Sequence, residues 1–325
     1  MRVFVTGGDG FIGRHLLPRL LAAGHRVTAL AGEPHSPAAL RALGVTAIVP
    51  GRLEAPDAWL SALAGHDAVI HLAGPVQVWG PWRLFEQQMV EATRRLYQAA
   101  QRHGVPRFVF SSSETVHWGA DVAALVDIDE DAPFSRRPYS HYSRAKQQVE
   151  RFLQAATGPT QAVIVRLPFV WGPGTKFLRA LQTHVQQGRF MWVGDRDMPL
   201  EAIHVDNAVA ALLAALTRGQ PGAAYLVTDE QPYTQAMFLG DIIRALGLPV
   251  PTRQAPVGLL RVWTAAAEGL WRVLPLPGSP QPMTRFELAF FTLPRRYRTA
   301  RARRDLGYRP VVDWATGLQG LRASS

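Results

Sequence analysis

Thr6-Gly7-Gly8-Asp9-Gly10-Phe11-Ile12-Gly13 is the stretch that decides the fold, and it lies between a β-branched run at 2–6 and a helical pattern at 11–24. Glycines in such a turn let the backbone approach a pyrophosphate and let the helix pack closely on the strand, while the helix N-terminus favours the anion. An ordinary glycine turn is the alternative, because a glycine motif alone discriminates poorly. The strand–turn–helix context favours a dinucleotide-binding turn.

Short apolar runs alternate with helical patterns beyond this turn, which indicates βαβ units and a parallel sheet. Glycine and proline recur after residue 172, and the regular alternation ends there. We therefore predict an α/β protein with a Rossmann-type doubly wound parallel sheet, formed by 1–172 and about 203–229. A smaller, mostly helical substrate lobe would comprise 173–202 and 230–325. Strands are predicted at 2–6, 26–30, 45–49, 68–72, 107–111, 162–166 and 224–228, with helices near 11–24, 56–64, 83–103 and 140–156.

The composition excludes several kinds of site. The chain has 325 residues and no cysteine, which excludes disulfides, thiolate metal sites and cysteine nucleophiles. The longest apolar run, 208–216, is far shorter than the roughly 18 residues that a membrane-spanning helix needs. No Gly-x-Ser-x-Gly or His-Glu-x-x-His motif occurs, and the histidines lack metal-ligand spacing, so no metal is expected. With no secretory pattern at its first residues, the protein is predicted to be cytoplasmic.

Tyr142 and Lys146 stand four residues apart in the helix predicted over 140–156, and Ser113 follows the fifth predicted strand. Positions i and i+4 face the same side of a helix, and ligands bind at the carboxyl ends of the strands in this architecture. An ammonium one turn away would lower the pKa of a tyrosine from about 10 towards the range useful for acid–base catalysis. A solvated helix pair is the alternative. Catalysis is favoured because only 2 of the 35 basic residues are lysines, and Lys146 is one of them.

These motifs resemble the extended short-chain dehydrogenase/reductases, also called the NAD-dependent epimerase/dehydratase family. The likeness extends through the glycine turn and the segments 71–74, 110–113, 142–146, 166–168, 172–174 and 304–310. It implies that Ser113 hydrogen-bonds the substrate oxygen, that Tyr142 is the acid–base group, and that Lys146 holds the nicotinamide ribose and lowers the pKa of Tyr142. The cofactor-binding residues that it implies are Gly7, Gly10, Phe11, Ile12, Gly13, Arg52, Leu72, Ala73, Gly74, Ser111, Tyr142, Lys146, Leu167 and Pro168.

Within the family, the segments 204–207, 282–286 and 302–308 are most similar to the 3β-hydroxysteroid dehydrogenase branch. That branch includes sterol dehydrogenases and bacterial reductases of 2-alkyl-3-oxoalkanoates. The resemblance implies an NAD(P)-dependent oxidoreductase that interconverts a ketone and a secondary alcohol on an apolar substrate, whether steroid-like, aryl or long-chain 3-oxo. One alternative is a sugar-nucleotide epimerase or dehydratase that uses NAD transiently. Another is a non-catalytic dinucleotide-sensing or nucleic-acid-associated protein.

The choice between NAD and NADP depends on the charges that follow the second strand. Glu33 could accept a hydrogen bond from the ribose 2′-hydroxyl, whereas Arg14, His35 and Arg52 could bind a 2′-phosphate, which gives a slight preference for NADP. Arg52 also departs from the family, because it stands where an aspartate is usual. Met89 departs likewise, at a position where the family has an asparagine.

Trp79, Trp118 and Trp171 follow predicted strand ends, where the ligand crevice is expected. Apolar pockets with a few polar groups suit apolar ligands, so we predict that these rings and Ser113 contact the substrate. Simple burial of the rings in the core is the alternative. The segment 258–274 has an amphipathic helical pattern, which we interpret as packing against the second lobe. A lid over the substrate or an interfacial membrane contact are the alternatives.

Six arginines fall within the ten residues 295–304 and account for most of the net charge of +10. Such runs usually form solvated faces, and a nucleic-acid patch is the alternative. No recognised binding module accompanies the run, so we expect a small-molecule substrate and no nucleic acid. The family resemblance suggests a homodimer through the helices near 83–103 and 140–156.

Overall fold

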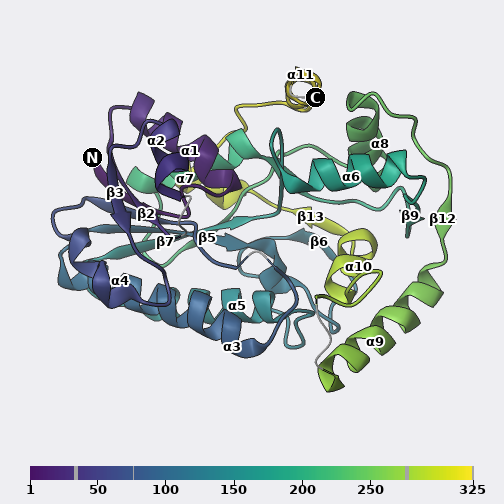
Figure 1. The fold of residues 1–325 in the computed structure, drawn as a ribbon, viewed down its shortest axis with the longest axis horizontal. Coiled ribbons are helices and arrows are strands. Elements are labelled where there is room, and N and C mark those ends of the chain that lie inside the picture. Colours follow the sequence, from purple (N-terminus) through teal and green to yellow (C-terminus); the bar gives the residue numbers. More distant parts are fainter. Residues whose placement is uncertain (33–35, 76, 275–277, 324–325) are drawn as a thin grey trace.

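Seven parallel strands form the main sheet of this computed structural model, which describes residues 1–32, 36–75, 77–274 and 278–323 (Figure 1). The strand order β11-β7-β5-β4-β1-β2-β3 reverses direction beside β1, as in a doubly wound sheet. The predicted Rossmann-type fold is therefore confirmed. The strands are β1 (Arg2–Thr6), β2 (Arg26–Ala31), β3 (Ala47–Pro50), β4 (Ala68–His71), β5 (Arg107–Ser113), β7 (Gln161–Leu167) and β11 (Ala224–Leu226).

Helices cover both faces of the sheet. In the view of Figure 1, α1 (Phe11–Ala22), α2 (Ser36–Ala42) and α7 (Val205–Thr217) lie above the strands, and α4 (Ala92–Arg102) and α5 (His141–Ala155) lie below them. The upper layer buries leucines of α1 against α7, and the lower layer buries aromatic and aliphatic side chains of α4 and α5. Burial on both faces explains why the central strands are almost continuously apolar.

A second, smaller set of elements comes mostly after β7 in the chain, with β6 as the exception. Its core is built on α6 (Lys176–Gln186), α8 (Gln235–Ala245) and α11 (Trp314–Ala323). Helices α9 (Val257–Val273) and α10 (Arg285–Thr292) complete this set. Three strand pairs tie it together: β8 (Phe169–Trp171) with β10 (Ala202–His204), β9 (Trp192–Val193) with β12 (Gln254–Ala255), and β6 (Leu125–Ile128) with β13 (Arg295–Tyr297).

The division into two lobes stays a prediction. One segment that we assigned to the second lobe packs in the core of the first. Residues 224–226 return to the main sheet beside β7, in the segment assigned to the first lobe. In contrast, Ala302, Leu306 and Tyr308 were assigned to the second lobe but pack in the core above the sheet. The end of the chain therefore contributes to both units.

Two helical predictions need correction. The segment predicted as a helix at 56–64 forms two short 3-10 turns, η1 (Pro56–Ala58) and η2 (Leu60–Leu63). Trp59 lies between them. Its indole nitrogen donates to the carbonyl of Arg52 at 2.9 Å, which connects the ring to the loop that contains Arg52. The helix predicted at 83–103 is also interrupted. It comprises α3 (Trp82–Phe85), the π-helical turn η3 (Glu86–Glu91) and α4.

The arginine run at 295–304 forms a solvated face only in part, because Arg298, Arg303 and Arg304 are exposed and the other three arginines are buried or partly buried. Arg295 is fully buried, and Arg303 is ion-paired with Glu230. Carboxylates also lie within ion-pairing distance of three further members of the run: Arg296 faces Glu201, Arg301 faces Glu130 and Asp131, and Arg304 faces Asp305. The prediction was therefore wrong for Arg295, Arg296 and Arg301, on which acids from distant parts of the chain converge.

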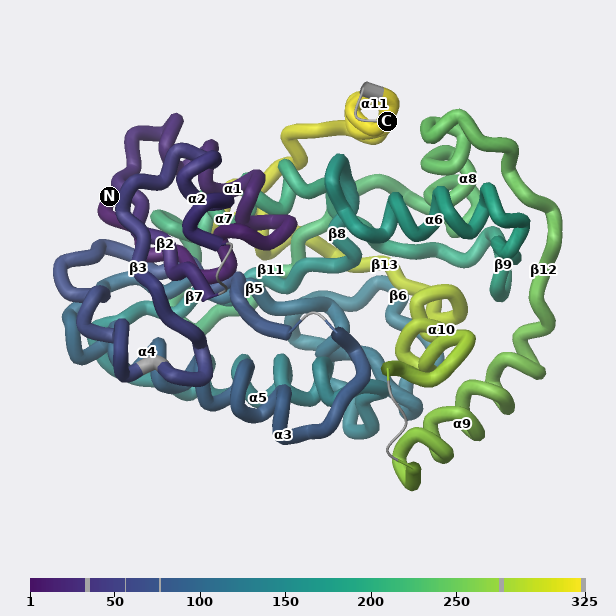
Figure 2. The backbone as a smooth tube through the Cα atoms, viewed as in Figure 1, coloured from purple at the N-terminus to yellow at the C-terminus, as the bar shows by residue number. Residues whose placement is uncertain are grey.

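Helix α9 also differs from its prediction. Figure 2 shows it standing away from the body of the molecule, joined through the extended segment of β12. Its buried residues are Thr264, Ala267 and Glu268, while most of its large apolar side chains are exposed. It therefore does not bury its apolar face against the second lobe. None of the helices in the described parts of the chain is long and apolar enough to cross a membrane.

Candidate active site

The glycine turn leaves no room for side chains at two of its positions. Gly7 has a φ of +72°, and a Cβ there would lie 2.8 Å from the backbone nitrogen of Ala73. A Cβ on Gly13 would lie 2.3 Å from the carbonyl oxygen of Gly7, so α1 packs directly against the turn. The turn and the start of α1 thus form a backbone cradle of the kind that accepts a pyrophosphate.

A buried histidine fixes the neighbouring loop to this turn. The two ring nitrogens of His71 lie 2.6 Å from the Thr6 hydroxyl and 2.9 Å from the Thr93 hydroxyl. Burial lowers the pKa of His71 to about 3, and the charge of Lys146 acts in the same direction, so the ring is neutral. The Thr6 hydroxyl also accepts a hydrogen bond from the backbone of Ala73 at 3.3 Å.

A cavity of about 300 Å³ lies over the glycine turn, at the carboxyl ends of β1 to β4. Among the predicted cofactor residues, Gly7, Arg52, Ala73 and Gly74 line it. The cradle and the cavity fit the adenosine diphosphate part of a dinucleotide. Sequence reasoning missed other lining residues with polar side chains: Asp9, Ser36, Glu54 and Gln88.

The charged side chains around this cavity have polar partners. Arg52 lies 3.1 Å from the Glu54 carboxylate, which also accepts from the Gln88 amide at 2.7 Å. Arg14 donates through its Nε to the carbonyl of Asp9 at 2.7 Å. The other two residues considered for cofactor choice, Glu33 and His35, lie outside the described residues.

Ser113 and Tyr142 meet at the end of β5. Ser113 is the last residue of this strand and pairs in register with Leu167 of β7, another predicted cofactor residue. Ser140 begins α5 by accepting the backbone N–H of Ser143 at 3.1 Å, which places Tyr142 in the first turn of the helix. Burial raises the pKa of Tyr142 to about 12, although hydrogen bonding with Ser113 acts in the opposite direction.

Lys146 lies one turn further along α5, and its ammonium is buried. Its Nζ donates to the carbonyl of Ser111 at 2.6 Å and lies 4.5 Å from the ring centroid of Phe110 and 5.7 Å from that of Tyr142. Burial lowers the pKa of Lys146 to about 8, and the Glu150 carboxylate opposes that shift. The expected lowering of the Tyr142 pKa by Lys146 is therefore wrong for this structure, because burial of the phenol outweighs the distant ammonium.

The remaining predicted cofactor residues lie near the glycine turn or near the Ser113 and Tyr142 hydroxyls. Gly10, Phe11 and Ile12 form the start of α1, and Leu72 follows β4. Pro168 is buried and follows β7 next to Leu167. The predicted set thus lies along the carboxyl ends of the strands, from the glycine turn to the end of β7.

A larger cavity, of about 1050 Å³, opens beside Tyr142. The residues just before Tyr142, at 138–141, form one wall, and the predicted substrate residue Trp79 lies on another. The end of α9 contributes Trp271 and Arg272, and the guanidinium of Arg272 lies 5.8 Å from the ring centroid of Trp79. Sequence reasoning missed Tyr139, Trp271 and Glu287, although the proximity of Tyr139 to Tyr142 was a usable signal.

The other two tryptophans predicted to contact substrate are buried. Trp118 is 1% exposed and packs between Phe286 and the guanidinium of Arg295. Trp171 has no exposed surface, and its indole nitrogen donates to Asp229 at 2.7 Å. Neither ring offers a surface to a substrate in this structure. For Trp118 and Trp171, the alternative of simple burial in the core is therefore the correct one.

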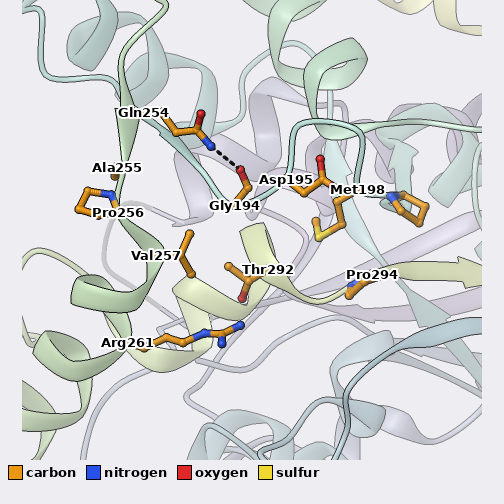
Figure 3. Close-up of a pocket in the computed structure, with 11 residues that line it drawn as sticks. Gly194, Asp195, Met198, Gln254, Ala255, Pro256, Val257, Arg261, Thr292 and Pro294 are labelled. Atoms are coloured by element: carbon orange, nitrogen blue, oxygen red, sulfur yellow. Dashed lines mark hydrogen bonds between the residues drawn. The ribbon is translucent and has the colours of Figure 1, made fainter.

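Figure 3 shows a separate hollow of about 750 Å³ in the smaller lobe. The first turns of α9 face the end of α10 and the loop at 194–199 across it, and Gln254 donates to the carbonyl of Gly194 at 3.1 Å. Among the described residues that line it there is none of the predicted site residues. The candidate site is therefore the region of Ser113, Tyr142 and Lys146.

Comparisons with known proteins agree with this geometry. The NAD dependent epimerase/dehydratase family matches residues 3–228. The chain is 33% identical to a 4-hydroxy-2-methyl-3-oxo-4-farnesyl-3,4-dihydroquinoline-1-oxide ketoreductase of Stigmatella aurantiaca, with 99% of this chain and 96% of that protein covered. It is 33% identical to a 2-alkyl-3-oxoalkanoate reductase of Stenotrophomonas maltophilia, with 100% and 99% covered. A 3-beta-hydroxysteroid dehydrogenase of Mycolicibacterium neoaurum is 28% identical, with 95% and 87% covered.

Solved structures show the same fold. The crystal structure of gox2253 has a TM-score of 0.79 at 23% identity, with 99% of this chain and 97% of that chain covered. A dTDP-glucose 4,6-dehydratase of Streptomyces venezuelae has a TM-score of 0.76 at 23% identity, with 100% and 96% covered. The prediction of an NAD(P)-dependent oxidoreductase is confirmed by the reductases and dehydrogenases among the relatives. The chain belongs to the NAD dependent epimerase/dehydratase family, as its motifs implied.

Proposed function

We propose that this protein reduces a ketone to a secondary alcohol on an apolar substrate, with NADPH as the hydride donor. The observation that carries the proposal is the Ser113 and Tyr142 hydroxyl pair beside a large cavity partly walled by Trp79 and Trp271. Rings of this kind suit aliphatic or aromatic ketones. Both relatives at 33% identity are named as reductases of oxo compounds, which supports the same class.

The residues of the site perform the proton chemistry. Ser113 donates a hydrogen bond to the ketone oxygen, and Tyr142 provides the proton that this oxygen needs. The nicotinamide, when bound, supplies the hydride to the carbonyl carbon. A tyrosine with a pKa of about 12 is fully protonated at neutral pH, and an alkoxide is a stronger base than a phenolate. Proton transfer from Tyr142 to the developing alkoxide is therefore favourable.

Lys146 holds positive charge close to this step. With a pKa of about 8 it remains mostly protonated at neutral pH. Its hydrogen bond to the Ser111 carbonyl anchors α5 to the end of β5, which keeps Tyr142 close to Ser113.

The preference for NADPH rests on Arg52. Its guanidinium lines the cavity over the glycine turn, and its pairing with Glu54 occurs at an exposed site. Exposed pairs contribute only about 0–1 kcal/mol, so the pairing with Glu54 opposes the binding of a 2′-phosphate by Arg52 only weakly. Arg52→Ala should weaken NADPH binding more than NADH binding. An equal effect on both cofactors would contradict this assignment.

The proposal is tested by cofactor oxidation with a panel of long-chain 3-oxo acids, aryl ketones and steroidal ketones, with NADH and NADPH in parallel. UDP-sugars are included, because turnover of a UDP-sugar without net cofactor consumption would favour the epimerase or dehydratase alternative. Tyr142→Phe should lower kcat by at least about a hundredfold, since a positioned acid contributes 10²–10⁴-fold, and should leave cofactor binding unchanged. Retained turnover in this variant would overturn the mechanism.

We also propose that the protein is a cytoplasmic homodimer through α4 and α5, which rests on the family resemblance. Sedimentation of the full chain tests the stoichiometry. A monomeric mass at micromolar concentration would contradict it.

A further inference from the structure

One side of α5 carries three polar residues at successive turns. Tyr142, Lys146 and Glu150 follow one another at intervals of four residues, so they face the same side of the helix. This side contacts the end of β5 through two hydrogen bonds. The Lys146 ammonium donates to the carbonyl of Ser111 at 2.6 Å, and the Ser112 hydroxyl donates to the Glu150 carboxylate. Two consecutive residues of the strand are therefore bonded to two consecutive turns of the helix.

The Glu150 carboxylate is also bonded to a neighbouring strand, β7. Arg166 donates to its Oε2 through Nε at 2.9 Å and through Nη2 at 2.8 Å, while Ser112 donates to its Oε1. Arg166 and Ser112 lie opposite one another in the register of β7 and β5. All three residues are at most 3% exposed, so water has little access to these bonds. Glu150 therefore joins α5 to two neighbouring strands at one buried point.

The same helix places Tyr142 against Ser113, the last residue of β5. In the proposed reaction the proton of Tyr142 passes to an oxygen that Ser113 binds, so the rate depends on how these two hydroxyls lie relative to one another. A misplacement of reacting groups by about 1 Å can lower a rate about a hundredfold, even when its cause lies away from the chemistry. A contact two turns along α5 can therefore affect the proton transfer.

We propose that Glu150 is a positioning residue for Tyr142. Its bonds to Ser112 and Arg166 hold α5 against the ends of two strands, which sets the approach of the Tyr142 hydroxyl to the substrate oxygen. Glu150 has no exposed surface, so it acts through the helix and not by contact with the substrate. The effect on proton transfer rests on the proposed function, whereas the effect on the position of α5 does not.

Ser112→Ala tests the proposal with little disturbance of the core, because it leaves the pair of Glu150 and Arg166 in place. The variant should lower kcat for a ketone by about tenfold, since Tyr142 is less well placed, with little change in KM or in the affinity for NADPH. Glu150→Gln should act in the same direction with a larger loss, but it also leaves Arg166 without its counter-charge. Ser112→Ala is therefore the deciding variant.

The matched control is Thr160→Val, which removes another buried hydroxyl. Thr160 lies just before β7, at the opposite end of that strand from Leu167, and its hydroxyl donates to the carbonyl of Val105 at 2.8 Å. Loss of this bond should lower the free energy of unfolding by an amount similar to the loss in Ser112→Ala. The kcat of Thr160→Val should nevertheless stay at the wild-type value, because this bond does not connect α5 to β5.

Hydrogen exchange followed by mass spectrometry tests the position of α5 without any measurement of activity. In Ser112→Ala, the backbone amides of residues 141–150 should exchange at least about fivefold faster than in Thr160→Val, because a hydrogen bond to a charged group no longer holds this part of the helix. Amides in α1, on the other face of the sheet, should exchange at the same rate in the two variants.

The outcomes separate this proposal from the proposed function. If the wild type reduces a ketone and Ser112→Ala has the same kcat as Thr160→Val, the positioning role is overturned and the proposed function stands. A rise in KM at unchanged kcat would overturn the positioning role as well. A wild type that reduces no ketone would overturn the proposed function. Faster exchange in α5 of Ser112→Ala alone would then still support the positioning of Tyr142, and equal exchange in the two variants would overturn it.

Discussion

Two buried arginine–glutamate pairs lie on either side of Ser113, and they differ in how completely their hydrogen bonds are formed. Arg166 donates to Glu150 at 2.8 Å and to the carbonyl of Glu130 at 3.0 Å, and Ser112 also donates to Glu150. These residues come from β7, α5 and β5, whose relative positions are fixed by the sheet.

The second pair, Arg295 and Glu114, has no hydrogen bond between its members. Arg295 Nε lies 3.6 Å from Glu114 Oε2, and both atoms lack a hydrogen-bond partner within the described residues. Burial raises the pKa of Glu114 to about 7, and the charge of Arg295 opposes this shift. The pair joins the turn η4 (Glu114–His117) to β13. The comparison indicates that a pair within the sheet achieves good geometry, whereas a pair between the two units retains a titratable carboxyl.

The largest effect should come from breaking the well-bonded pair. Arg166→Met leaves Glu150 as an uncompensated buried charge, which should lower the free energy of unfolding by about 3–5 kcal/mol. Arg295→Met should cost clearly less, because Glu114 can take up a proton near neutral pH. Chemical denaturation at pH 7 measures both. Arg244→Met, at an exposed ion pair, is the control and should cost less than about 1 kcal/mol. Equal losses of unfolding free energy in Arg166→Met and Arg295→Met would contradict the difference between the two pairs.

A smaller effect is expected in the pH dependence of stability, to which the raised pKa of Glu114 contributes. Because its pKa is raised in the folded state, Glu114 retains a proton that the unfolded chain has lost, and its contribution to stability falls as pH rises from about 4.5 to 7. Glu114→Gln should remove this loss, so the variant should gain relative to the wild type by up to about 1.4 kcal/mol per pH unit in that window.

The difference between the two proteins is the quantity to measure, because buried histidines such as His71 and His117 add a slope of the opposite sign to both. Glu201, whose pKa burial raises to about 8, is also common to both. A difference that does not vary between pH 5 and 7 would show that Glu114 is ionised throughout.

The smallest effect concerns two buried tyrosine hydroxyls. Tyr297 OH has no partner within the described residues, so Tyr297→Phe should change the free energy of unfolding by no more than about 0.5 kcal/mol. Tyr97 OH donates to the carbonyl of Thr160 at 2.7 Å, so Tyr97→Phe should cost about 1 kcal/mol. The same denaturation measurement applies, and a larger loss at Tyr297 would reveal a bond within the Glu114 cluster.

The parts that sequence could predict are those that short segments determine. The glycine turn follows from neighbours in the chain, and Tyr142 and Lys146 from one helical turn. Their meeting with Ser113 follows from the rule that parallel strands end at the same edge. The fold class and these positions therefore needed no knowledge of distant contacts.

The remainder depends on contacts between distant residues. Nothing near Trp118 indicates that Arg295 and Phe286 will cover its ring, and nothing near Arg295 indicates Glu114. The pattern of α9 showed an apolar side, but not whether another element would cover it. The raised pKa of Tyr142 likewise depends on how completely the folded chain excludes water from the phenol.

The arginine run at 295–304 restricts movement of the smaller lobe relative to the sheet. Its carboxylate partners come shortly after β5, β6 and β11 and directly before β10, so the run connects the sheet to the smaller lobe through several ion pairs. The two units cannot swing apart unless Arg295 leaves its place against Trp118 and several ion pairs break together. Opening of a hinge between the two units would therefore require a large free energy. A substrate could enter more easily by displacement of α9, in which only three side chains are fully buried.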